Sequence, residues 1–223
     1  MKRFLLSALS AALLAQPLQL NAQQPCLYPG VPGATEYLNF LSGSGVNGGY
    51  GVQVGPYKAA FGIGVTAPAF SIYCVDYTHY AKDQYVNVTG LGPVGTLSNT
   101  RLNNYGLYQQ AAYLSSLFDT APTTSWGGIH AAIWSLTSGQ TLGNTTQRNY
   151  YLGLAATNAS AFNTSGWYVL SPTSLSSTTG GQEFLMRTVS VPEPATVLLL
   201  ATGLLLMAGV SRKRLIGLNE EDA

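Results

Sequence analysis

The C-terminal part of the sequence contains an apolar run unlike the rest of the chain. Residues 195–210 carry no charged side chain, and at about 1.5 Å per residue they would form a helix about 24 Å long. Arg212, Lys213 and Arg214 follow. Long basic side chains can extend to the interface and so match a hydrocarbon core of about 30 Å. We therefore expect a transmembrane helix over residues 195–211, not a buried helix of a soluble domain.

The N-terminal residues are typical of an exported chain. Lys2 and Arg3 precede an apolar segment, and residues 20–22 offer an A-x-A-like cleavage site. This order predicts a signal peptide over residues 1–22, cleaved between Ala22 and Gln23. Because basic flanks stay in the cytoplasm, the basic cluster after the apolar run places residues 23–190 outside the inner membrane. Residues 215–223 would then form a cytoplasmic tail.

The span between these two ends carries no net charge. Half of the ten basic residues of the chain lie in its two terminal segments, and residues 23–190 contain as many acidic as basic side chains. Nucleic-acid binding needs clustered Lys and Arg, so we expect no nucleic-acid partner. Aromatic residues recur throughout the span, unlike in disordered chains. We expect an exported domain over residues 23–170, then a linker and a last strand over residues 171–190.

The first part of this domain has the pattern of a β-sheet. Short runs rich in β-branched and aromatic residues alternate with clusters of Gly and Pro, which is typical of strands and turns. Two similar runs follow near the end of the domain. The expected strands are residues 35–41, 50–54, 59–65, 70–76, 84–89, 167–170 and 182–189.

The middle of the domain has the pattern of helices. Apolar residues recur at spacings of three and four over residues 104–118. A second helix is expected to begin at Ser125 as N-cap and to end at Gly139, and a third to begin at Asn144, with Gln147 at the capping-box spacing. The expected fold class is α+β, a β-rich domain with a helical insert, plus an N-terminal signal peptide and one C-terminal transmembrane helix.

The segment before the apolar run completes a three-part pattern. It consists of Val191, Pro192, Glu193 and Pro194, then the apolar helix, then the basic cluster. This order resembles the PEP-CTERM sorting signal of Gram-negative bacteria, here over residues 191–214. The resemblance implies processing near the Pro-Glu-Pro by an exosortase, a membrane-embedded transpeptidase-like enzyme. It also implies delivery from the inner membrane to the cell surface or extracellular space.

A second resemblance concerns the domain itself. Residues 73–76, Tyr-Cys-Val-Asp, and the helix segment 131–134, Ala-Ala-Ile-Trp, resemble motifs of the thioester domains of bacterial surface adhesins. In that family the Cys thiol condenses with a Gln four residues before the Trp. His130 occupies that position here, and an imidazole has no carboxamide carbon for a thiol to join. The resemblance therefore implies the scaffold without the thioester. In the alternative, Gln109 or Gln110 on the preceding helix would supply the carboxamide that reacts with Cys74.

Two other hypotheses involve Cys74. In an oxidising compartment a disulfide between Cys26 and Cys74 is expected to stabilise the domain by about 3–4 kcal/mol. Alternatively, Cys74 and His130 form a nucleophile–base pair, with Asp76 or an Asn orienting the imidazole. The sequence shows no phosphate-binding loop or cluster of metal ligands, so we expect no cofactor and no metal.

These features together favour a non-catalytic protein of the cell surface. We expect adhesion or extracellular-matrix interaction, with a surface polysaccharide or a matrix protein as partner, and no enzymatic activity. A hydrolase or transferase using Cys74 and His130 is one alternative. A passive structural protein of the cell envelope is the other.

Overall fold

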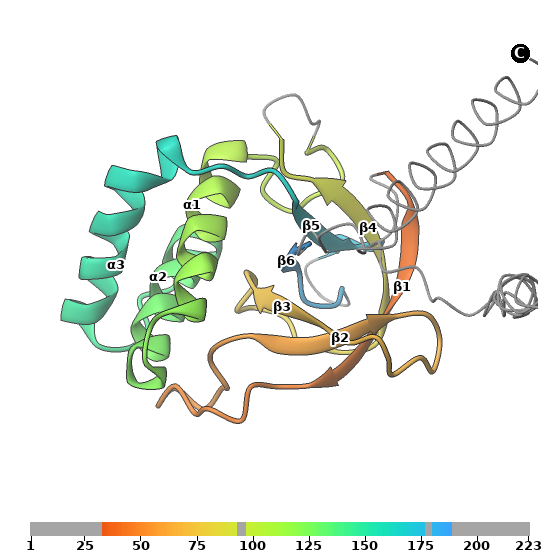
Figure 1. Cartoon of the computed structure of the whole chain (residues 1–223), viewed down its shortest axis with the longest axis horizontal. Coiled ribbons are helices and arrows are strands. Elements are labelled where there is room, and N and C mark those ends of the chain that lie inside the picture. The colour runs from red at the N-terminus through yellow and green to blue at the C-terminus, as the bar shows by residue number, and fades with distance from the viewer. Residues whose placement is uncertain (1–32, 93–96, 177–179, 189–223) are drawn as a thin grey trace, which may run out of the picture.

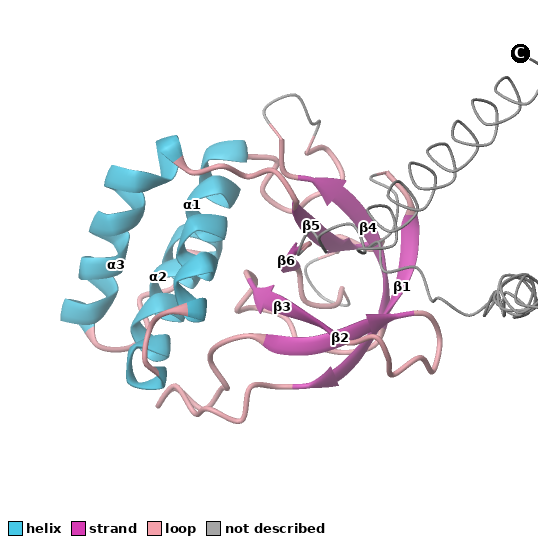
Figure 2. Cartoon of the chain, in the orientation of Figure 1, coloured by secondary structure: helices cyan, strands magenta, loops and turns pink. Residues whose placement is uncertain are grey.

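A computed structural model describes residues 33–92, 97–176 and 180–188. Six strands close into an antiparallel barrel, and three helices lie together beside it (Figure 1; Figure 2). The strands are β1 (Thr35–Ser42), β2 (Tyr57–Phe61), β3 (Phe70–Cys74), β4 (Gln84–Gly90), β5 (Trp167–Pro172) and β6 (Phe184–Arg187). The helices are α1 (Tyr105–Ser116), α2 (Trp126–Ser138) and α3 (Thr145–Asn158), with the short 3₁₀ helices η1 (Leu117–Asp119), η2 (Thr123–Ser125) and η3 (Ala159–Ala161).

The order of strands around the barrel is β1-β2-β3-β6-β5-β4, and β4 closes on β1. The last strand in the sequence, β6, therefore pairs on both sides, with Phe184 opposite Cys74 of β3 and Leu170 of β5. All three helices fall between β4 and β5, which are neighbours in the barrel. The helices are thus an insert in one connection of the barrel, and the expected α+β class is confirmed.

The barrel is filled by the side chains that alternate inward along its strands. In β4, Val86 and Val88 are fully buried, whereas Tyr85, which directly precedes Val86, is half-exposed. This alternation is that of a strand with one face in contact with solvent. The ring of Phe184 lies edge-to-face against Tyr57 of β2. Leu38 and Ile72 are also inaccessible to solvent.

The helical insert continues the same core. In α2 most residues are buried, including Ile129 and Ile133, so this helix is covered on nearly all sides. In α3 only Arg148 and Ala155 are buried, which makes it the outer helix of the insert. Burial of α2 between the barrel and its neighbouring helices explains its apolar composition.

The helix boundaries follow the caps that the sequence predicts. Asn144 accepts a hydrogen bond from the backbone N–H of Gln147, which caps α3. Gly139 ends α2 in the left-handed conformation, at φ 65°. Ser125 does stand directly before α2, but its side chain makes no capping hydrogen bond, and it is the last residue of η2.

The strand predictions are wrong in one place and too long in others. Residues 50–54 form a loop with one isolated bridge, between Asn47 and Gln53, because Gly49 and Gly51 have φ values of 80° and 78°. The strand expected over 59–65 ends at Phe61, since Gly62 has a φ of 109°.

The strands near the ends of the domain also differ from their expected limits. The strand expected over 70–76 ends at Cys74, and the one expected over 182–189 is Phe184–Arg187. Conversely, β5 continues to Pro172, two residues into the expected linker, and there Ser171 is completely buried.

Several predictions fall outside the described residues. They are the signal peptide with its cleavage site, Cys26, the sorting motif, the transmembrane helix over residues 195–211 and the cytoplasmic tail. Among the helices of the described part, none has the length and hydropathy needed to span a membrane.

Candidate functional site

Cys74 and His130 do lie in one region, where β3 ends against α2. Trp134, one turn after His130 in the helix, stacks on its imidazole with ring centroids 4.6 Å apart and planes 9° apart. The indole Nε1–H of Trp134 donates to the Cys74 Sγ at 3.3 Å. Cys74 and His130 have no solvent exposure, and Trp134 has almost none. The structure therefore brings the predicted thiol and imidazole into one buried group.

The thiol of Cys74 is held in its protonated form. Its S–H donates to the backbone carbonyl of Asp76, at 3.3 Å. Burial raises the pKa of Cys74 to about 12, although the hydrogen bonds from Trp134 and to Asp76 act in the opposite direction. A reactive cysteine has a lowered pKa and access to solvent. Cys74 has neither property.

The imidazole of His130 is held in its neutral form. Its Nδ1 accepts a hydrogen bond from the backbone N–H of Gly55 at 2.9 Å, which places the ring proton on Nε2. Burial lowers the pKa of His130 to about 3. The lone pair that a general base would use is thus already occupied by a backbone donor from the β1–β2 loop.

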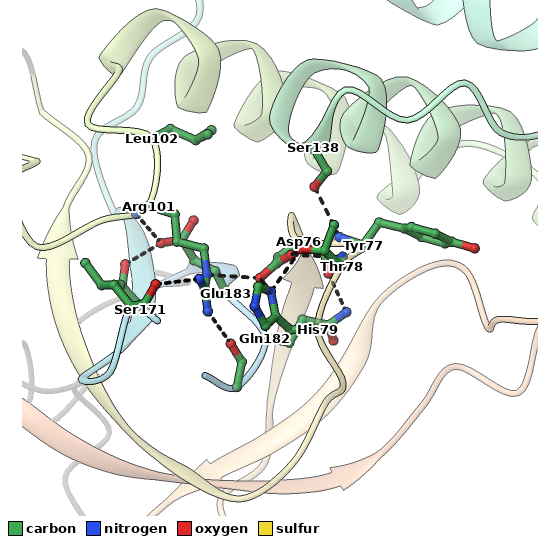
Figure 3. Close-up of polar contacts among 12 residues, drawn as sticks. Asp76, Tyr77, Thr78, His79, Arg101, Leu102, Ser138, Ser171, Gln182 and Glu183 are labelled. Atoms are coloured by element: carbon green, nitrogen blue, oxygen red, sulfur yellow. Dashed lines mark hydrogen bonds and ion pairs between the residues drawn. The ribbon is translucent and has the colours of Figure 1, made fainter. Parts of the chain in front are cut away.

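Asp76 does not orient the imidazole of His130, contrary to the sequence-based hypothesis. Its Oδ2 contacts Nδ1 of His79 at 2.6 Å and Nε of Arg101 at 3.0 Å, and its Oδ1 accepts from the backbone and hydroxyl of Thr78 (Figure 3). Thr78 occupies one oxygen of the Asp76 carboxylate, which leaves the other oxygen to contact His79 and Arg101. His79 therefore pairs with Asp76.

A second carboxylate, Glu183, is buried beside this pair. Its Oε2 accepts from the Tyr108 hydroxyl and its Oε1 from the Ser171 hydroxyl, both at 2.6 Å, and Oε1 also accepts from the Arg101 backbone N–H at 3.0 Å. Only 1 % of Glu183 is exposed, and burial raises its pKa, while its hydrogen bonds and Arg101 act to lower it. Each oxygen of this carboxylate is thus satisfied by a neighbouring donor.

Arg101 joins the two carboxylates (Figure 3). Its side chain also donates to the carbonyls of Leu175 and Gly181, at 3.1 Å and 2.8 Å. We call Asp76, His79, Arg101 and Glu183 the buried charge cluster. It connects the turn after β3, the loop before α1 and the residues that lead into β6. Its members differ in chain position by about a hundred residues, so no local pattern in the sequence reveals them as a group.

Gln182 brings a carboxamide close to the same place. Its Nε2 donates to the backbone carbonyl of Asp76 at 2.7 Å, the acceptor that Cys74 also uses. The two amides that the sequence offered as alternatives lie on α1, where Gln109 donates to the carbonyl of Phe162. Gln182 is therefore a carboxamide near the thiol that sequence reasoning missed, since it was expected only as the first residue of the last strand.

No cluster of three or more His, Cys, Asp or Glu side chains suited to a metal ion occurs among the residues that the structure describes. The buried charge cluster contains an arginine, which supplies the positive charge that a cation would otherwise provide. Its arrangement is that of a structural ion-pair network.

The comparisons with known proteins bear on the C-terminal end of the chain. A family model described as the PEP-CTERM protein-sorting motif matches residues 190–214. The chain therefore carries this motif at its C-terminus, as the three-part pattern predicted. The motif implies export, processing by an exosortase, and tethering at or sorting to the cell surface. No curated protein and no solved structure matches the chain.

Proposed function

We propose that the barrel domain is a non-catalytic module for adhesion or matrix interaction, presented outside the cell after sorting. The observation that carries this proposal is the state of Cys74 and His130. Both are fully buried, and burial holds the thiol protonated and the imidazole neutral. A thiol enzyme would instead present a thiolate to its substrate.

The arrangement around Cys74 supports the resemblance to a thioester domain that has lost its coupling residue. Cys74 lies at the end of a strand and contacts the Trp of a helix, and His130 takes the place of the Gln one turn earlier. In this proposal Trp134 and His130 retain the scaffold, and no covalent bond forms between Cys74 and a carboxamide.

Replacing His130 by Gln tests the resemblance directly. The Gln would place a carboxamide one helical turn before Trp134, in reach of the thiol. Attack of the thiol on the amide carbon forms a C–S bond, breaks the C–N bond and releases ammonia with the thiol proton. The intact mass of His130→Gln should then fall by one ammonia, and the double variant with Cys74→Ser should not change. An unchanged mass in His130→Gln contradicts the resemblance.

The mass of the natural chain, without substitutions and isolated from its native host, tests the rest of the proposal. Cleavage after Ala22 and loss of the residues that follow Pro194 would agree with export and sorting, whereas a mass that includes residues 195–223 contradicts processing. A mass lower by two hydrogens would reveal the Cys26–Cys74 disulfide. A loss of one ammonia that is absent in Cys74→Ser would reveal a thioester in the natural chain, with Gln182 as the first amide to replace. The same loss in both chains would come from cyclisation of the N-terminal Gln23 that signal cleavage exposes.

Replacing Cys74 distinguishes a binding module, which should keep its function, from a thiol enzyme, which should lose it. The variant Cys74→Ala should keep surface attachment of cells and matrix binding. Hydrolytic or transfer activity that disappears in Cys74→Ala, but persists in an equally stable core variant such as Val86→Ala, would favour the enzyme. A chain that is exported and attached yet binds no matrix component in either form would favour a passive structural role.

A further inference from the structure

The long loop between β1 and β2 forms a pocket with the helical insert. In Figure 1 this loop extends from the barrel to the ends of α2 and α3. The pocket is open to solvent and has a volume of about 520 Å³, within the range of about 300–1,000 Å³ typical of small-ligand sites. The sequence presented residues 50–54 of this loop as a strand.

The side chains that line the pocket are polar but uncharged. They come from the loop, from η2 and from the start of α3, and they are Asn47, Tyr50, Thr123, Thr124, Asn144 and Gln147. Within the described residues, no Asp, Glu, Lys, Arg or His lines the pocket. Amide and hydroxyl groups both donate and accept hydrogen bonds, so this lining matches a ligand that does the same without charge.

The pocket also has an apolar part. Val46 and Val54 contribute aliphatic surface, and the partly buried ring of Tyr50 contributes an aromatic one. A sugar ring combines both requirements, since its hydroxyls form hydrogen bonds at its edge and its C–H groups present an apolar face. An aromatic ring beside amide groups meets both parts of such a ligand.

Tyr50 is held in place by glycines of the elements that it contacts. A Cβ atom on Gly127, in the first turn of α2, would lie 2.9 Å from the Tyr50 hydroxyl, and one on Gly143 would clash with the same group. Gly48 passes the ring at similarly close range. The tyrosine therefore packs closely against backbone from two sides, and a site fixed before binding loses less entropy when the ligand arrives.

The charge near this site does not favour an acidic ligand. Arg148 acts on the pKa of Tyr50, which burial raises and Arg148 lowers. Arg148 is itself buried, however, and its Nη1 donates to the carbonyl of Leu142 at 2.9 Å. Its guanidinium is therefore already engaged by the protein, and it is not part of the lining.

We propose that this pocket binds a neutral saccharide segment of an extracellular polysaccharide. This proposal rests on the proposed matrix role, which would bring the domain into contact with such a polysaccharide. It assigns the recognition to the β1–β2 loop and the helical insert, away from Cys74 and His130. Hydroxyl groups of the sugar exchange hydrogen bonds with Gln147, Asn47 and the threonines, and one sugar face lies against Tyr50.

Binding can be measured with the full-length chain, purified in a detergent that has no sugar headgroup. A panel of neutral oligosaccharides is compared with uronic-acid oligosaccharides of the same length. We expect binding to neutral members only. The variant Gln147→Ala should weaken that binding by about fivefold, the loss of one hydrogen bond. Thr124→Trp, which fills the pocket, should reduce it by at least tenfold.

Two controls on α3 carry the same kinds of change outside the pocket lining. Asn149→Ala removes an exposed amide outside the lining, and Thr157→Trp adds an indole at the opposite end of α3. Both should bind as the natural chain does, and all four variants should unfold at its temperature. Binding to the acidic panel alone, binding that the pocket variants do not alter, or no binding to either panel overturns the proposal. Export and surface attachment of the chain test the matrix role separately.

Discussion

At the scale of single residues, the environment of Cys74 and His130 is decided by burial. Both side chains are absent from the molecular surface, and their pKa values move in opposite directions, to about 12 and about 3, because each avoids its charged form. The sequence suggested that Cys74 and His130 lie near one another. It does not show that Gly55, 75 residues away, occupies the Nδ1 lone pair.

The thiol of Cys74 should react slowly while the chain is folded. At pH 8 a thiol with a pKa of about 12 is ionised in only about one molecule in 10⁴. In the variant Cys26→Ser, modification by a soluble alkylating reagent should be at least about 100-fold slower in the folded state than in denaturant, as followed by mass spectrometry. Rapid modification of the folded chain would contradict the burial and the protonated state of Cys74.

His130 should make folding stability depend on pH in the acidic range. Its folded pKa lies below the unfolded value of 6.5, so its contribution is present above pH 6.5 and is lost as the pH falls toward 3. The free energy of unfolding should decrease by up to about 1.4 kcal/mol for each pH unit in this window. Denaturant unfolding at several pH values measures it.

The raised pKa of Glu183 changes the free energy of unfolding in the opposite direction. Its contribution to stability is greatest below pH 4.5 and declines as the pH rises. The effect of His130 is therefore the difference between the natural chain and His130→Asn, which retains an acceptor for Gly55 and keeps Glu183. If both chains lose stability in parallel below pH 6.5, the buried neutral imidazole is not the cause.

At the scale of elements, local signals in the sequence predicted helices better than strands. Asn144 and Gly139 mark helix ends through their own hydrogen bonds and φ preference, so three or four residues suffice to identify them. Strand ends depend on partners far along the chain. The loop over residues 50–54 has the composition of a strand, yet positive φ values at Gly49 and Gly51 and its position beside α2 keep it out of the barrel.

The two predicted N-caps provide a matched pair for mutation. Asn144→Ala removes the hydrogen bond to the Gln147 backbone and should lower the free energy of unfolding by about 1 kcal/mol. Ser125→Ala removes a side chain that makes no capping hydrogen bond and should change it by less than about 0.5 kcal/mol. Chemical denaturation measures both, and equal effects would contradict the difference in capping.

At the scale of the whole molecule, the buried charge cluster connects parts that the sequence keeps far apart. Asp76 was expected to orient the imidazole of His130, whereas no role was predicted for Arg101 or Glu183. Only the closed barrel brings the start of β6 beside the turn after β3, so this part of the site could not be predicted from spacing or composition.

Breaking this cluster should cost far more than breaking an exposed ion pair. Arg101→Met leaves Asp76 buried without the guanidinium that pairs with it, and the free energy of unfolding should fall by about 3–5 kcal/mol. The backbone N–H of residue 101 still donates to Glu183 in this variant. Arg187→Met removes the Arg187–Asp119 pair, in which both side chains are about half-exposed, and should cost about 0–1 kcal/mol. A similar loss in the two variants would show that the cluster is solvated.

The position of β6 also sets the order of events during export. β3 and β5 leave two unpaired edges facing each other until residues 184–187 arrive between them, and such edges readily pair with other chains. When the chain crosses the membrane N-terminus first, the strand that closes the barrel is translocated just before the sorting motif, which begins at residue 190. Completion of the domain therefore comes just before arrival of its membrane signal, which shortens the time for which the barrel stays open after it crosses the membrane.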